Sequence, residues 1–121
     1  MAGAGFITHK GRKILHIDLS YSEFDEILEA IGQAAGLIRT EPAGSVLGLV
    51  DVSKSIFNKD VAQALKDFAA ENEPFIKFSI AVGIDGIKAV IFNAIMVSTR
   101  RKNIITMDDV EKAKDFLAGM L

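Results

Sequence analysis

The chain has 121 residues, of which half are apolar and a quarter are charged, with a formal net charge of -2. This length suits one domain with a sizeable core, and the composition is that of a globular protein. The charge balance lacks the basic excess of a general nucleic-acid binder, and the absence of cysteine excludes disulfides and thiolate sites. We therefore expect a single domain over residues 1–121 that binds no nucleic acid.

Two stretches bear on where the protein resides. The first thirteen residues lack the basic region and apolar stretch of a secretory signal, and we expect residues 1–5 to form a flexible N-terminus. The most apolar run, AVIFNAIMV, is interrupted by Asn93 and has about half the ~20 residues that a membrane span needs. These features predict a cytoplasmic protein without a membrane span.

The chain is expected to open with a β-hairpin and a helix. Two strand-like runs cover residues 6–8 and 13–19, and Gly11 between them can supply the positive φ angle of a tight turn. Ser20 and Glu23 then have the spacing of a capping box, and apolar residues recur every three or four positions as far as Ile38. This pattern predicts the first helix.

The remaining elements alternate between strands and helices. The apolar run at 46–52 predicts a strand covered on both faces, and Asn58 is a good N-cap for a second helix. A third core strand at 75–83 precedes a turn bracketed by glycines, and a third helix is expected over 87–98. By helical spacing, its predicted core stripe is Ile87, Val90, Ile91, Ala94, Ile95 and Ser98.

A short strand at 104–106 and a last helix, preceded by the capping-box-like pair Thr106 and Asp109, complete the series. The order is therefore β-β-α-β-α-β-α-β-α. This order predicts an α/β fold with a mostly parallel sheet of four or five strands, a β-hairpin at its start, and about four helices.

The carboxyl ends of parallel strands are where enzymes of this architecture place their catalytic groups. A histidine base would have to come from His9 or His16, and both lie on the predicted hairpin rather than on a loop after a parallel strand. We interpret His16 as a partly buried, hydrogen-bonded histidine. Because no His, Asp or Glu cluster has metal-ligand spacing, we predict no catalytic residues, no metal, no cofactor and no enzymatic activity.

Two phosphate-related alternatives also find little support. The stretch GIDG at 83–86 has the outline of a KH-type GxxG loop, but it follows a strand and contains the acidic Asp85, so we interpret it as a turn. The helix that begins there could still receive an anion or a partner carboxylate at its N-terminus. A receiver-type phosphoacceptor site at Asp51 would lack cation ligands, because Asp18 is the one acid on the first long strand.

The stretch LVDVSKSIFNKDVAQAL at 49–65 resembles the signature of STAS domains, and the element order is similar too. The closest likeness is to the SpoIIAA-like group of small stand-alone bacterial proteins. Asp51 matches the strand-ending acid of that signature, and Phe57 matches its buried aromatic residue. The resemblance implies a STAS-like regulatory or protein-protein interaction module.

One position departs from the STAS pattern. The antagonists carry a serine that a kinase phosphorylates, whereas 59–62 here reads Lys, Asp, Val and Ala, without a hydroxyl. Asp60 there is either an imitation of the charged state or an ordinary first-turn residue. Ser53 and Ser55 nearby are either modified or ordinary turn residues. The expected partner-binding residues are Asp51, Ser53, Ser55, Phe57, Asn58, Lys59, Asp60, Gly83, Asp85 and Gly86.

The third helix is apolar on more than one side. Ala89, Phe92 and Met96 project away from the predicted core stripe, so we expect a second copy in a homodimer, a neighbouring helix or a hydrophobic ligand to cover them. Accordingly, Phe92→Ser or Met96→Lys is predicted to change self-association or ligand binding more than folding. The alternative function is thus a carrier or sensor of a small apolar or lipid-like ligand, which requires an apolar cavity of ~300 Å³ or more.

Overall fold

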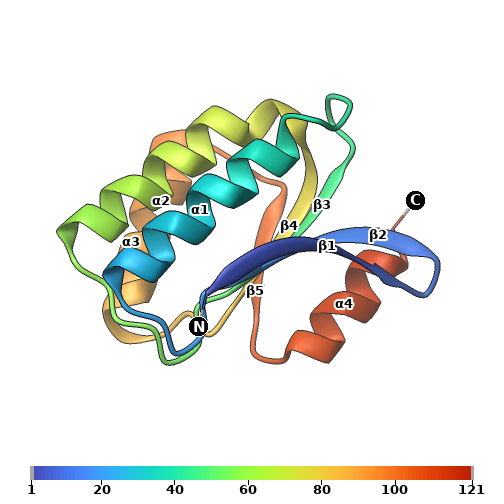
Figure 1. The fold of residues 1–121 in the computed structure, drawn as a ribbon. Coiled ribbons are helices and arrows are strands. Elements are labelled where there is room, and N and C mark those ends of the chain that lie inside the picture. The colour runs from blue at the N-terminus through green and yellow to red at the C-terminus, as the bar shows by residue number, and fades with distance from the viewer. Residues whose placement is uncertain (1, 121) are drawn as a thin grey trace.

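The computed structural model describes residues 2–120 and confirms the predicted α/β fold. Within that range, one five-stranded sheet with the strand order β1-β2-β3-β4-β5 is accompanied by four α-helices and a short 3-10 helix, η1 (Figure 1). The elements are β1 (Gly3–His9), β2 (Arg12–Asp18), α1 (Phe24–Ile38), β3 (Val46–Asp51), α2 (Lys59–Asn72), η1 (Glu73–Phe75), β4 (Ile76–Val82), α3 (Gly86–Thr99), β5 (Ile104–Met107) and α4 (Val110–Ala118).

The sheet begins with the expected hairpin. β1 and β2 are antiparallel, and the two turn residues, Lys10 and Gly11, have φ angles of 50° and 80°. Positive φ at both central positions is the geometry that suits a two-residue hairpin, so the expected role of Gly11 is confirmed. The flexible N-terminus predicted for residues 1–5 is wrong for residues 3–5, which pair with 16–18, because Ala4 packs against the core beneath α1.

The chain order places the helices in two layers. Each step from β2 to β5 leads to the adjacent parallel strand in the same direction, and right-handed crossovers then put all the connecting helices on one face. Figure 1 shows α1, α2 and α3 together on that face and α4 on the other. The sheet therefore has a core on each side.

β3 is the central strand and contributes to both cores. Val46, and Val52 directly after the strand, belong to the cluster beneath α1 and α2, whereas Leu47 and Leu49 belong to the cluster beneath α4. Each of these four side chains is at most 3% exposed. The nearly continuous apolar run of the sequence is thus explained by a strand that is covered on both faces.

The N-cap of helix α1 lies three residues after the predicted cap. Glu23, not Ser20, is the N-cap, and its backbone N–H donates to Glu26 Oε1 at 3.4 Å. Ser20 instead donates its hydroxyl to Asp18 Oδ1 at 2.5 Å. These bonds hold the segment before α1 as a turn at the end of β2. A serine hydroxyl that bonds a nearby side chain cannot also cap the helix, and the capping-box spacing does not reveal this competition.

None of the helices within residues 2–120 combines the length and apolar character that crossing a membrane requires.

Candidate binding surfaces at the carboxyl edge of the sheet and on α3

The loops that follow β2 and β3 are joined to each other, and to the end of β4, by backbone hydrogen bonds. Leu19 N–H donates to the carbonyl of Asp51 at 2.8 Å, and Tyr21 N–H donates to that of Ser53 at 2.9 Å. In the same way, Val52 N–H donates to the carbonyl of Val82 at 2.9 Å. The two loops and the end of β4, with the loop that continues from it, therefore form one connected surface, called the carboxyl edge below, rather than separate flexible segments.

The two strand-ending aspartates stabilise these loops. Asp18 Oδ1 accepts from the backbone N–H of Ser20 at 3.0 Å, and Asp51 Oδ1 accepts from that of Ser53 at 2.9 Å. In each case the aspartate carboxylate closes a turn by bonding the backbone N–H two residues later. Asp51, the residue that matches the STAS signature, thus lies at the carboxyl edge with a structural hydrogen bond of its own.

Gly83 allows the loops after β3 and β4 to approach closely. Its φ angle is +86°, and a Cβ added there would lie 2.5 Å from Ser53 Oγ and 2.6 Å from Ser53 N. Gly86, at the first position of α3, also has a positive φ angle of +50° but has no atom within 4 Å of an added Cβ. Only the first of these two expected site residues is therefore needed for loop contact.

The start of α2 is arranged as its sequence predicts. Asn58 Oδ1 accepts from Val61 N at 2.8 Å, which confirms Asn58 as the N-cap. Lys59 and Asp60 are exposed on the first turn, and Phe57 is half-buried against the core. This helix start presents one charge of each sign to a partner.

The two serines of the loop after β3 differ in accessibility. Ser55 is 8% exposed, and its hydroxyl donates to the carbonyl of Val52 at 2.6 Å. Ser53 is half-buried against Gly83. Burial of the Ser55 hydroxyl makes it a poor acceptor for a kinase, so its expected place in a partner-binding surface is not favoured by its position.

Two apolar side chains at the carboxyl edge were missed by the sequence reasoning. Tyr21 is 73% exposed and Ile56 is 53% exposed. The loops that carry them touch, because Ile56 N–H donates to the carbonyl of Ser22 at 3.1 Å. The available signal was Tyr21 within the polar stretch SYSE and Ile56 beside Phe57 within SKSIFN. Exposed aromatic and aliphatic side chains on a rigid support are typical anchors of protein interfaces.

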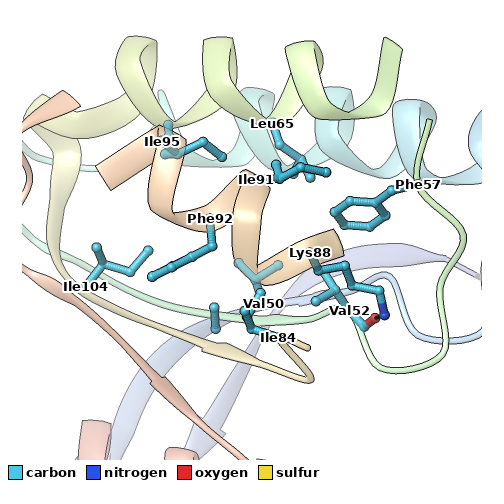
Figure 2. A pocket seen from close by; sticks show the side chains of 12 residues that line it. Val50, Val52, Phe57, Leu65, Ile84, Lys88, Ile91, Phe92, Ile95 and Ile104 are labelled. Atoms are coloured by element: carbon cyan, nitrogen blue, oxygen red, sulfur yellow. Dashed lines mark hydrogen bonds between the residues drawn. The ribbon is translucent and has the colours of Figure 1, made fainter. Parts of the chain in front are cut away.

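Lys88 on α3 points into the protein. Its side chain is 9% exposed, and its Nζ donates to the carbonyl of Val52 at 2.8 Å and lies 3.9 Å from Asp85 Oδ1 (Figure 2). The Nζ also lies 5.8 Å from the centre of the Phe57 ring. Lys88 therefore links α3 to the loop after β3 and to the residue before the α2 cap.

A small apolar cavity lies between the sheet, α2 and α3, with a volume of about 80 Å³. Figure 2 shows the side chains of Phe92, Ile91 and Leu65 directed toward it. This volume is well below the ~300 Å³ lower bound for ligand pockets. In this conformation the cavity beneath α3 is therefore smaller than a carrier of a lipid-like ligand requires.

Helix α3 is rotated relative to its predicted orientation. Ile87 and Val90, which were predicted to lie in the core, are 64% and 63% exposed, and Ala94 and Ser98 of the same predicted stripe are exposed too, so that part of the stripe is wrong. Phe92 instead lines the internal cavity, and Ala89 and Met96 are half-buried. The rotation follows from Lys88, whose ammonium reaches a backbone carbonyl and an aromatic ring on the inner side.

A second, open hollow of about 310 Å³ lies on the sheet face that carries α4. Gly3 and Gly5 pair with Asp18 and His16, and the hollow arises where these glycines lack side chains. His16 Nε2 is buried without a hydrogen-bond partner within residues 2–120, so the expected hydrogen bond at this nitrogen is not seen. Besides the two glycines and Ala2, the hollow is lined by Phe6, Ile7, His16 and Asp18.

The described residues contain no group of three or more His, Asp or Glu side chains that could hold a metal ion. His9 Nε2 lies 2.7 Å from Asp115 Oδ1 and thereby joins the hairpin to α4. Both histidines therefore lie on the hairpin strands, His9 in β1 and His16 in β2, and not on the loops after β3 and β4.

No protein-family model matches the chain, and a search of curated proteins finds no significant match. The STAS resemblance therefore continues to rest on the motif at 49–65 and on the order of the elements.

Proposed function

We propose that this protein is a non-enzymatic, STAS-like interaction module that binds a protein partner through the carboxyl edge. The observation that carries the proposal is the exposure of Tyr21 and Ile56 on loops that are hydrogen-bonded to each other and to the end of β4. Such preordered loops lose little conformational freedom on binding, which favours recognition.

The charged surroundings of this pair support a protein partner. Lys59, Asp60 and Asp85 are exposed on the same side of the sheet, at the starts of α2 and α3. Apolar anchors within a polar, charged rim are the usual composition of protein-protein interfaces. Because position 60 is an aspartate rather than a serine, we propose that this surface is permanently charged and is not switched by phosphorylation.

The proposal can be tested by affinity purification with the full chain from extracts of its native source, followed by quantitative mass spectrometry. Wild type is compared with Ile56→Asp, which places a charge at the proposed anchor, and with Leu28→Asp, a control at a 38% exposed position of α1 that lies outside both proposed surfaces. A partner is expected to be recovered equally with wild type and control and at least about tenfold less with Ile56→Asp. Equal recovery with all three proteins would count against the carboxyl edge.

A second candidate function is supported by the cavity beneath α3. Its lining is apolar apart from Lys88, whose ammonium lies at one side, and this combination suits a small ligand with an aliphatic chain and an acidic group. Binding of a lipid-sized ligand would require α3 to move outward, because the cavity holds only about 80 Å³.

The carrier function can be tested with a fluorescent fatty acid as the probe. Ile91→Trp is designed to fill the cavity, and Val90→Trp is the matched control on the exposed side of the same helix. Loss of binding in the first variant alone would support a carrier. Absence of probe binding to wild type at lipid concentrations up to solubility would exclude this class of ligand.

A further inference from the structure

The outer side of α3 carries a continuous apolar stripe. Ile87, Val90 and Val97 are 64%, 63% and 79% exposed, and Ala94 between them is exposed as well. Their spacing of three, four and three residues is the spacing of one side of a helix that packs on another helix. We call these four residues the α3 stripe.

No charged side chain interrupts the α3 stripe. The one charged residue of α3, Lys88, is directed inward to the carbonyl of Val52, and the exposed polar neighbours of the stripe are Asn93 and Ser98. A helix that is apolar around its circumference is ordinarily covered on both sides. The sheet and α2 cover one side of α3 here, and the α3 stripe is left for another molecule.

The two ends of the α3 stripe carry opposite charges. Asp85 directly precedes α3, and its side chain is 84% exposed. Arg100, in the left-handed conformation, directly follows α3 and is exposed, as is Lys102 two residues later. An occupant that matches the stripe should therefore present a basic group near Asp85 and an acidic group near Arg100.

A second copy of the same helix, running in the opposite direction, has this charge arrangement. We propose that the protein forms a symmetric dimer through antiparallel α3 helices. In this register Ile87 lies opposite Val97 of the second copy, and Val90 lies opposite its Ala94. Asp85 of each copy then lies next to the other copy's Arg100, whereas a parallel arrangement would place like charges together.

The small side chain of Ala94 supports a close approach of the two helices at the centre of the contact. A helix of 14 residues is about 21 Å long, so the contact is at the lower end of specific interfaces in size. We expect a reversible dimer with a dissociation constant in the micromolar range. The proposal goes beyond the interaction module, because the α3 stripe does not include Tyr21 or Ile56.

The first test is sedimentation analysis of the full chain over a range of concentrations. Val90→Glu is expected to weaken self-association at least about tenfold, because a carboxylate would be buried without a partner. Leu28→Glu is the matched control, because Leu28 lies on α1 and is 38% exposed, and it should leave the dimer unchanged. Circular dichroism establishes that both variants remain folded.

Charge exchange tests the predicted ends of the contact. Asp85→Arg and Arg100→Asp are each expected to weaken the dimer several-fold, and the double variant is expected to restore it. If the single variants weakened the dimer through folding, the double variant would be weaker still, because it carries both changes. Restoration of the dimer would therefore indicate a direct charge contact. A double variant weaker than either single variant would contradict the antiparallel register.

Cross-linking tests the direction of the helices directly, since the natural chain contains no cysteine. A mixture of the Ile87→Cys and Val97→Cys proteins is expected to form a disulfide-linked heterodimer on oxidation. Cross-linked Ile87→Cys homodimers would instead indicate parallel helices and overturn the proposal.

Two further results would also overturn it. One is a wild-type protein that stays monomeric at concentrations on the order of 1 mM, beyond the range expected for a specific contact. The other is a monomer whose binding to phosphatidylglycerol vesicles is abolished by Val90→Glu, which would assign the α3 stripe to a membrane surface.

Discussion

A single glycine determines how closely two of the carboxyl-edge loops approach. Gly83 has a positive φ angle, and its missing side chain leaves room for the Ser53 backbone. Because the obstructing atoms include backbone, they cannot be moved aside by a change of rotamer. The connection between the loops after β3 and β4 therefore depends on this residue.

Gly83→Ala is expected to lower the free energy of unfolding by about 2–4 kcal/mol, from left-handed strain and from the clash with Ser53. Gly86→Ala has comparable strain but open space around it, so its expected cost is about 1–2 kcal/mol. Urea denaturation measures both variants. Equal losses would contradict the close contact at Gly83.

The carboxylate of Asp115 on α4 contacts both His9 and Lys10 of the hairpin. Hydrogen bonds from His9 and then from Lys10 lower the pKa of Asp115 below its ordinary value of 3.8. A lowered pKa in the folded state means that the ionised carboxylate stabilises the fold at any pH above the ordinary value. This contribution disappears as the pH falls through the lowered pKa.

Asp115→Asn should therefore melt at a lower temperature than wild type at pH 7, and the difference should decrease as the pH falls below 3.8 and through the lowered pKa of Asp115. Thermal melts at several pH values check this expectation. Because Asp115 is exposed, the effect should also decrease in high salt. A melting difference that persists unchanged to pH 2 would show that the side-chain change acts through packing.

At the scale of elements, α3 shows how one polar residue can determine the orientation of a helix. Apolar spacing alone placed Ile87 and Val90 in the core, because nearly every position of this helix is apolar and several stripes fit. The structure places Lys88 inward, where it finds the Val52 carbonyl, and the exposed stripe moves accordingly. A sequence does not reveal such a distant backbone partner.

Phe92→Ser is now expected to lower the free energy of unfolding by about 2 kcal/mol, since Phe92 lines the internal cavity. Val97→Ser, on a side chain that is 79% exposed, should change it by less than about 0.5 kcal/mol. Both are measured at low concentration, where self-association contributes little. The sequence pattern alone favours an effect of Phe92→Ser on self-association or ligand binding more than on folding. A loss of stability as small as that of Val97→Ser would agree with that first expectation.

Lys88 itself can be replaced if its volume is kept. The Val52 carbonyl also accepts the Ser55 hydroxyl, so Lys88→Met leaves it hydrogen-bonded and should change stability by less than about 1 kcal/mol. Lys88→Ala removes the packed stem as well and should cost about 2 kcal/mol. Similar losses for both variants in urea denaturation would show that the ammonium group, not the stem, matters most.

At the scale of the whole molecule, the sequence predicts the fold well and the site incompletely. Gly11 and Asn58 act through local geometry, so the hairpin and the start of α2 are confirmed. The cap of α1 was wrong because the preceding turn is held by distant loops, with Tyr21 bonded to Ser53. The same docking exposes Tyr21 and Ile56, and no local pattern reveals a surface made by separate loops.

The fold as a whole separates two surfaces with different proposed roles. The carboxyl edge is formed by loops after neighbouring strands, whereas the α3 stripe consists of exposed side chains on α3. Figure 1 shows α3 in the helical layer on one face of the sheet. The central claim is that the protein acts by binding other proteins and not by carrying a small molecule. The small cavity beneath α3 supports this claim.

Native mass spectrometry of the protein purified from its natural source tests that claim most directly. An interaction module is expected to show masses of one chain, of two chains, or of a complex with another protein, each without a bound small molecule. A small molecule that is retained on the intact protein and released on activation would contradict the interaction module and favour a carrier.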